Sequence, residues 1–138
     1  MDEHKLHIKV VTPDGIIFEY NAATLVVLNT TSGELGIMAN HMPVISALKI
    51  GEIKLIDELN ELEERMAVSG GFAEFSNNTL TVVADAAERA DDIDVARAES
   101  AKERAERRIA QANSARDADR ARLALLRAVN RIHVVTGK

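Results

Sequence analysis

The chain has 138 residues, of which 46% are hydrophobic and 28% charged, values that suit one small domain with an appendage. It has no Cys, which excludes disulfides, thiol nucleophiles and cysteine metal sites. No apolar run reaches about 18 residues, so we expect no membrane insertion, and the opening residues 1–5 show no signal segment, so we expect a cytoplasmic protein.

The formal net charge of −5 is unevenly distributed along the chain. Residues 1–88 hold five Lys or Arg against fourteen Asp or Glu, a balance of −9. Residues 89–138 hold twelve against eight, a balance of +4, and ten of those twelve cations are Arg. This asymmetry predicts two parts with different roles, which we place at residues 1–87 and 88–138.

The first part has the pattern of short β-strands. Strands are expected at 6–10, 16–20, 24–29, 44–48, 52–56, 66–69, 72–75 and 79–83. Pro13–Gly15 and Asn77–Asn78 mark tight turns, because Asn and Gly tolerate a positive φ. The stretch 57–64 has the weakest pattern and also suits a short helical turn. Many short strands at close spacing predict an antiparallel β-sandwich or a barrel.

The second part changes to helical periodicity. Asp91 and Asp92 are the expected caps of a helix that starts near Ile93, and Asn113–Ser114 is the expected break before a second helix to about Val134. Small apolar residues recur at helical spacing on one face of each helix: Ala98, Ala101, Ala105, Ile109 and Ala112, then Ala118, Ala121, Leu125, Ala128, Val129 and Ile132. Two helices with a short link predict an antiparallel hairpin, and an α+β fold for the whole chain.

The alanine-rich seam predicts a weakly stabilised hairpin. A buried Leu or Ile contributes roughly 1.5–3 kcal/mol, against about 0.8 kcal/mol for a methyl-sized group. We therefore expect the hairpin to exchange between a packed and an extended state. Uniform, core-like protection of its amides would contradict this expectation.

Enzyme constellations are missing from the sequence. The four His do not pair at the spacing of metal ligands, and no glycine-rich phosphate loop is present. No pair of carboxylates is singled out as an acid and a base. We expect no catalytic residue, no metal site and no tightly bound cofactor.

Four Arg residues of the hairpin have a suggestive spacing. Arg97 and Arg104 are seven apart on the first helix, and Arg127 and Arg131 are four apart on the second, so a folded hairpin could bring them together. Guanidinium groups suit phosphate oxygens, and Asp94, one turn before Arg97, could orient it. The alternative is a solvated face crossed by helical ion pairs: Lys102–Glu106, Glu103–Arg107 and Asp119–Arg122.

The segment 33–43 combines two Gly, one Pro and several apolar residues outside a clear strand. It suits a buried turn between strands. It also suits a loop that contacts a partner, with Glu34 and His41 as polar contacts.

Several stretches together resemble the epsilon subunit family of rotary ATP synthases. The motifs are Val-Val-Thr-Pro-Asp-Gly (10–15), Gly-Glu-Leu-Gly-Ile-Met-Ala-Asn-His-Met-Pro (33–43), Val-Ser-Gly-Gly-Phe (68–72), Val-Val-Ala-Asp-Ala-Ala-Glu-Arg-Ala (82–90), 93–98 and 124–131. The resemblance covers essentially the whole chain and implies a β-sandwich followed by a helical hairpin.

The resemblance also implies a non-catalytic role and a set of partners. The family's sandwich lies on the central stalk of a proton-transporting ATP synthase, held by the gamma subunit and touching the membrane rotor ring of c subunits. The implied location is peripheral, at the cytoplasmic face of the cell membrane. Glu34 and His41 fall in the family's ring-contacting loop, where Ala39–Asn40 replace the usual Pro-Gly.

A regulatory ligand is implied as well. In the family the hairpin can extend into the catalytic head of alpha and beta subunits and block ATP hydrolysis, and some members bind ATP on the folded hairpin. The family's motif stands here as Ile93-Asp94-Val95-Ala96-Arg97-Ala98. Its further contacts match Glu88, Arg104, Arg127 and Arg131.

Two alternatives belong to other classes of protein. One is a structural adaptor that does not sense a ligand. The other is a nucleic-acid-binding hairpin, which the eight interleaved acids and the lack of aromatic residues after position 88 disfavour.

Overall fold

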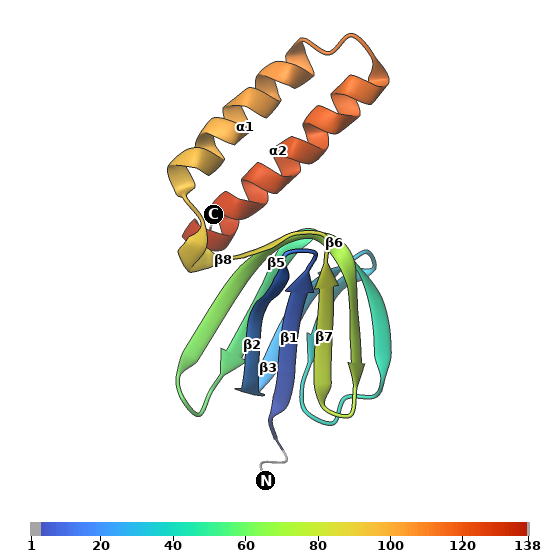
Figure 1. The fold of residues 1–138 in the computed structure, drawn as a ribbon, viewed down its shortest axis with the longest axis vertical. Coiled ribbons are helices and arrows are strands. Elements are labelled where there is room, and N and C mark those ends of the chain that lie inside the picture. Colours follow the sequence, from blue (N-terminus) through green and yellow to red (C-terminus); the bar gives the residue numbers. More distant parts are fainter. Residues whose placement is uncertain (1–3, 138) are drawn as a thin grey trace. The chain divides into compact units, whose positions relative to one another are not determined.

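The computed structural model describes residues 4–137. Its contacts divide the chain into two compact units, with the boundary between Arg89 and Ala90. The first unit is built from β-strands and the second from helices (Figure 1). Each unit buries its own set of apolar residues.

The eight strands of the described chain form one continuous sheet in the order β2-β1-β7-β6-β5-β3-β4, with β8 pairing beside β6. The strands are β1 (Leu6–Thr12), β2 (Gly15–Ala23), β3 (Leu25–Thr30), β4 (Gly33–Ile37), β5 (Val44–Asp57), β6 (Leu62–Ser76), β7 (Thr79–Ala84) and β8 (Ala87–Arg89). All pairings are antiparallel except β1 with β7.

The sheet folds over into the two layers of a β-sandwich through its long central strands. Strands β5 and β6 pair with each other along their whole length. The second half of β6 also pairs with β7, and its first half pairs with β8. On its other side, β5 pairs with β3, mainly through its second half. The bend falls at Gly70 and Gly71, both with positive φ. A Cβ at Gly71 would lie 2.1 Å from the Val83 carbonyl oxygen, so no other residue fits the close approach of β6 and β7.

The predicted β-sandwich is confirmed, but several predicted strands are continuous. The predicted pairs 44–48 with 52–56, and 66–69 with 72–75, are the single strands β5 and β6. Gly51 lies inside β5 and does not break the strand. A Cβ at this position would lie 2.7 Å from the Asn29 Cβ, so close packing against Asn29 requires a glycine here. The stretch 57–64 is no helical turn: it is a hairpin turn closed by the Glu61 N–H to the Glu58 carbonyl.

Both predicted tight turns are confirmed. Asn77 and Asn78 have φ values of 52° and 55° and join β6 to β7 as a two-residue hairpin turn with both central residues left-handed. Thr12 pairs with Gly15 across the first turn, where Gly15 has a φ of 116°.

The sandwich core follows the period-two alternation of the strands. Its largest fully buried side chains are aliphatic or aromatic: Phe75, Leu6, Ile8, Leu28, Ile37, Ile53, Leu55, Met66, Leu80, Val10, Val26 and Val68. These residues come from both layers, so the core lies between them.

One buried carboxylate joins the two layers. Asp57, fully buried at the end of β5, accepts hydrogen bonds from the Tyr20 hydroxyl of β2 and from the Asn60 side-chain amide, the latter at 2.7 Å. The hydrogen bond from Asn60, followed by that from Tyr20, lowers the pKa of Asp57. The Asp57 carboxylate in turn raises the pKa of Tyr20.

The second unit is the predicted helical hairpin. It contains a short 3₁₀ turn η1 (Ala90–Asp92), then α1 (Val95–Ala110) and α2 (Ala115–Thr136). Ser114 caps α2 by accepting the Asp117 N–H at 3.1 Å, and Gly137 ends it in the left-handed conformation.

The seam between the helices is built largely from alanine. Ala98, Ala105, Ala121 and Ala128 are all no more than 3% exposed. The other predicted seam residues are half-buried, with one exception: Val129 is 42% exposed. The prediction for Val129 is wrong because its position lies about 100° beyond Ala128 around the helix, outside the narrow seam.

Candidate functional site

Several predicted ATP-binding residues lie at the start of α1. Asp94 is the cap: its side chain accepts the Arg97 backbone N–H at 3.2 Å. The predicted caps Asp91 and Asp92 are wrong, because both lie in η1 before the extended residue that begins the helix. Asp94 therefore fixes the backbone of Arg97. Ile93 and Ala98 are buried, at 8% and 1% exposure, and anchor this end of the hairpin.

Arg97 and Arg104 border the same hollow on α1. Both are exposed, and with Ala96 and Ser100 they line a shallow surface hollow of about 410 Å³. A separation of seven positions returns the helix to nearly the same face, about 10.5 Å further along. A small floor of Ala and Ser leaves this space open between two guanidinium groups.

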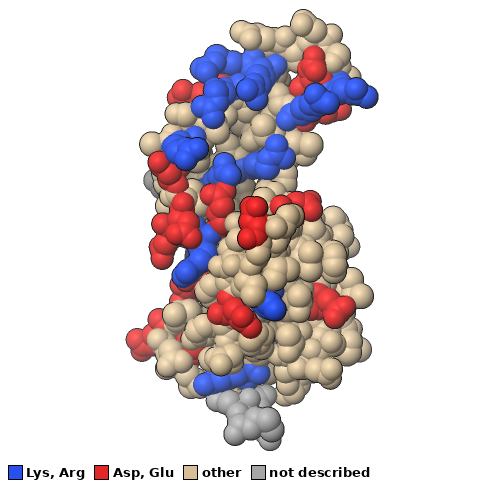
Figure 2. Space-filling view, viewed as in Figure 1, with Lys and Arg blue, Asp and Glu red and all other residues tan. Residues whose placement is uncertain are grey.

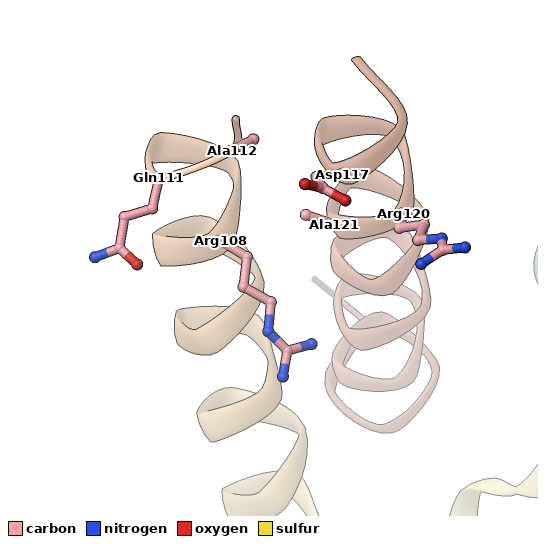
Figure 3. Close-up of a pocket in the computed structure, with 6 residues that line it drawn as sticks. All are labelled: Arg108, Gln111, Ala112, Asp117, Arg120 and Ala121. Atoms are coloured by element: carbon pink, nitrogen blue, oxygen red, sulfur yellow. The ribbon is translucent and has the colours of Figure 1, made fainter. Parts of the chain in front are cut away.

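A second hollow lies at the tip of the hairpin, between the end of α1 and the start of α2. It has about 340 Å³ and is lined by Arg108, Gln111 and Ala112 on the α1 side and by Asp117, Arg120 and Ala121 of α2. Figure 3 shows Arg108 extending across this space toward α2, while Arg120 points away from α1.

Heptad spacing relates this hollow to residues away from the tip. Gln111, Arg104 and Arg97 are seven residues apart on one helix, and Arg120 and Arg127 are seven apart on the other. Since Gln111 and Arg120 line one hollow, we expect the residues a heptad further along both helices to follow one edge. We call the three exposed residues Arg97, Arg104 and Arg127 the arginine edge; their convergence on one side of the folded hairpin stays a prediction.

Two other predicted ATP-binding residues, Arg131 and Glu88, differ from these three in burial or in the unit to which they belong. Arg131 is half-buried, four residues after Arg127. Glu88 belongs to strand β8 of the sandwich unit, so it is not part of the hairpin.

The arginine edge is electrostatically uncompensated. Within residues 4–137, the guanidinium groups of Arg97, Arg104 and Arg127 have no ion-pair partner. Arg122 of α2, by contrast, pairs with Asp119 at 2.8 Å, as predicted. Figure 2 shows Lys and Arg gathered over the hairpin.

Two of the predicted helical ion pairs are wrong. Lys102–Glu106 and Glu103–Arg107 are not formed in the part of the chain that the structure describes. Three of these four side chains are exposed, and an exposed pair gains too little to hold two long side chains in one geometry.

The predicted contact segment of the sandwich is partly a strand. Residues Gly33–Ile37 form β4, the edge strand beside β3, and only 38–43 is a loop, so the assignment of 33–43 to a turn or loop is wrong over its first half. Glu34 lies exposed on β4, opposite Asn29. His41 is half-buried, with its ring edge-on to Phe75 at 5.9 Å.

Sequence reasoning missed the apolar surface around this loop. Met38, Met42 and Ile45 are 61%, 74% and 70% exposed. Nothing in their spacing separates them from core residues. Gln111 and Arg120, which line the hollow at the tip of the hairpin, have a heptad relation to Arg104 and Arg127.

Other kinds of site are not seen in the described chain. Residues 4–137 contain no cluster of His, Asp and Glu able to hold a metal ion. No helix among the same residues is long and apolar enough to cross a membrane.

Both units match domains of one known protein family. Residues 5–90 match the family described as ATP synthase, Delta/Epsilon chain, beta-sandwich domain, and residues 91–136 match its long alpha-helix domain. The chain belongs to the ATP synthase delta/epsilon chain family. The resemblance read from the sequence motifs is thereby confirmed.

Relatives in this family align over nearly their whole length. The ATP synthase epsilon chain of Pediococcus pentosaceus is 52% identical over 132 residues, which covers 94% of each chain. That of Ligilactobacillus salivarius is 52% identical over 139 residues, covering 97% of this chain and 98% of the relative.

Solved structures of ATP synthases share the fold of this delta/epsilon family member. A chain in the mitochondrial ATP synthase of Euglena gracilis superposes with a TM-score of 0.76 at 21% identity, covering 88% of this chain and 76% of its own length. A chain in the central stalk and c-ring of the Tetrahymena thermophila enzyme gives 0.54 at 15% identity, covering 66% and 71%.

Proposed function

We propose that this chain is a non-catalytic central-stalk subunit of a rotary, proton-transporting ATP synthase, whose hairpin binds ATP and regulates ATP hydrolysis. Family membership supports the place in the complex. The arginine edge is the observation that carries the ligand: three exposed guanidinium groups without an ion-pair partner in residues 4–137.

The chemistry of the edge favours a polyphosphate. Three like charges along one side of a helix pair repel each other, and an anion that spans them relieves this repulsion. A triphosphate carries several negative oxygens along its length, whereas a single carboxylate would reach one guanidinium. Ile93 and Ala98 anchor the end of α1 where the adenosine part would lie, and Arg131 completes the proposed set on the hairpin.

Regulation would follow from the weak seam. Arg97 and Arg104 lie on α1 and Arg127 on α2, so a ligand bound by all three holds the helices together. ATP then favours the packed hairpin in proportion to its higher affinity for that state. At low ATP the hairpin extends into the catalytic head of alpha and beta subunits and blocks hydrolysis.

The sandwich supplies the coupling role. One row of apolar residues crosses the outer side of five paired strands in register: Ile16, Val11, Val83, Phe72 and Ala47. Ile16 and Phe72 are 58% and 46% exposed, unusual for such side chains. We assign this row to the gamma subunit. Glu34 and His41 are assigned to the rotor ring, at the cytoplasmic face of the membrane.

Calorimetric titration of the full chain with ATP, and with ADP for comparison, tests the ligand. Arg127→Gln removes one charged contact and should weaken ATP binding by about 10- to 100-fold. Arg122→Gln is the matched control: it removes the same charge from the same helix, but Arg122 lies on another face, paired with Asp119.

The outcomes separate two functions. Saturable one-to-one binding that Arg127→Gln weakens and Arg122→Gln does not supports the sensor. Equal loss in both variants indicates general charge attraction. Absence of binding up to millimolar ATP leaves a structural adaptor of the stalk.

A further inference from the structure

Two left-handed asparagines meet where the loop 38–43 passes the turn between β6 and β7. Asn40 lies in the loop with a φ of 69°, and Asn78 lies in the turn with a φ of 55°. L residues other than Gly rarely adopt this conformation, and Asn is among the few that tolerate it. Two such residues in contact across 38 positions of sequence point to a specific arrangement.

The two residues exchange hydrogen bonds. The Asn40 backbone N–H donates to the Asn78 side-chain oxygen at 2.6 Å, and the Asn78 side-chain amide donates to the Asn40 side-chain oxygen at 3.1 Å. Asn78 is itself fixed, because its carbonyl accepts the His7 N–H of the neighbouring chain segment at 2.9 Å. The pair therefore ties the loop to the hydrogen-bonded sheet.

The tied loop carries exposed apolar side chains. Met38 and Met42 are 61% and 74% exposed on either side of Asn40. The His41 N–H donates to the Met38 carbonyl at 3.2 Å, and its ring stands against Phe75. Holding flexible Met side chains on an ordered backbone lowers the conformational entropy lost when they dock.

We propose that Asn40 and Asn78 form a latch that positions the loop 38–43 for docking on the rotor ring. The latch deepens the proposed coupling function and rests on it. Asn78 acts through Asn40 and does not itself touch the partner. The hydrogen bond that the Asn78 side-chain amide donates to Asn40 is separate from the role of Asn78 in the turn. Asn77 has the same left-handed turn conformation but does not take part in the pair.

Asn78→Gly isolates the latch. Glycine preserves the left-handed turn and removes only the side chain, and Asn77→Gly makes the same change one residue earlier, as the matched control. In the full chain, amide hydrogen exchange at Asn40 should accelerate about tenfold in Asn78→Gly and remain within about twofold of the wild type in Asn77→Gly. Equal rates in the two variants overturn the latch.

Docking is measured on purified ATP synthase depleted of this chain and placed in lipid vesicles. The concentration of added chain that half-restores ATP-driven ion uptake should rise about tenfold for Asn78→Gly and stay unchanged for Asn77→Gly. Faster exchange with unchanged restoration overturns the positioning role and leaves the coupling function in place. Failure of the wild-type chain to restore uptake overturns the coupling function, and the docking role with it.

Discussion

The sandwich and the hairpin are packed by different kinds of side chain. The sandwich buries Leu, Ile, Val and Phe between two layers, with Leu28, Leu55 and Phe75 no more than 1% exposed. The hairpin buries mainly Ala at the contact between its helices. A fully buried Leu contributes roughly 1.5–3 kcal/mol and a methyl group about 0.8 kcal/mol, so the two units have very different reserves of stability.

This difference would allow the chain to combine a rigid body with a conditional one, as the proposed function requires. A strand sandwich with a large aliphatic core transmits force without changing shape. A hairpin near the margin of stability can be shifted by a ligand, since binding at 100 times Kd adds about 2.7 kcal/mol. If this contrast holds, substitutions and ligands should affect the two units to very different extents.

The largest effect is expected in the sandwich core. Leu55→Ala should lower the free energy of unfolding of the sandwich unit by about 2–5 kcal/mol, because it leaves a cavity at a fully buried position. Urea denaturation followed by far-UV circular dichroism measures this change. Leu59→Ala, at a residue 67% exposed in the β5–β6 turn, is the control and should change stability little. Similar effects of the two variants would contradict the core assignment.

ATP should stabilise the hairpin selectively. At about 100 times Kd, amides of α1 and α2 should exchange about 100-fold more slowly, while those of β5 and β6 stay unchanged. Arg127→Gln should abolish most of this protection at the same ATP concentration. Protection that spreads equally over both units would mean that ATP acts elsewhere than on the arginine edge.

Loss of one methyl group in the seam should have a measurable effect of intermediate size. Ala105→Gly should destabilise the hairpin by roughly 1–2 kcal/mol, through lost helix propensity and a lost buried methyl. Ser100→Gly, at an exposed position of α1, isolates the propensity contribution. Native-state hydrogen exchange across α1 and α2 gives both values. If Ala105→Gly costs no more than Ser100→Gly, the seam contributes nothing at this position.

The smallest effect is expected from the buried carboxylate, because it appears only at extreme pH. The pKa of Asp57 is lowered in the folded state, so its contribution is present above the ordinary carboxyl pKa near 4 and is lost as the pH falls through the folded value. The pKa of Tyr20 is raised, so its contribution is full below about 10 and is lost as the pH rises through the folded value.

Asp57→Asn tests this assignment through the acid limb of the sandwich's stability profile, measured by urea denaturation between neutral pH and pH 3. The variant should lose part of the acid dependence. Glu58→Gln, at an exposed neighbour, should keep it. An unchanged acid limb in Asp57→Asn would assign that dependence to other carboxyl groups.

The sequence predicted the tight turns correctly, but it did not predict the lengths of the long strands. Asn77–Asn78 and Pro13–Gly15 identify their turns because the left-handed conformation selects Asn and Gly. The strands expected at 44–48 and 52–56 leave out Gly51, and those expected at 66–69 and 72–75 leave out Gly70–Gly71, yet these glycines lie inside β5 and β6. Their role depends on contacts with Asn29 and Val83, which are distant in sequence.

Site residues divide in the same way. Seven-residue spacing is enough to place Arg97 and Arg104 on one face of α1, because it nearly completes two helical turns. Spacing within each helix could not show which hollow Arg97 and Arg104 border, nor that Asp94 rather than Asp91 caps α1. It also gave no sign that Asn40 meets Asn78.

The sequence by itself determined the sandwich followed by a hairpin, and the alanine seam, because alternation, helical period and composition are local properties of the chain. Its motifs, taken together, carried the resemblance to the family. Tertiary structure alone decided where the sheet folds over, which charges stay unpaired and how the loop 38–43 is held. Those features depend on close approach between residues far apart in sequence, and pairwise distance is not encoded in spacing along one strand or one helix.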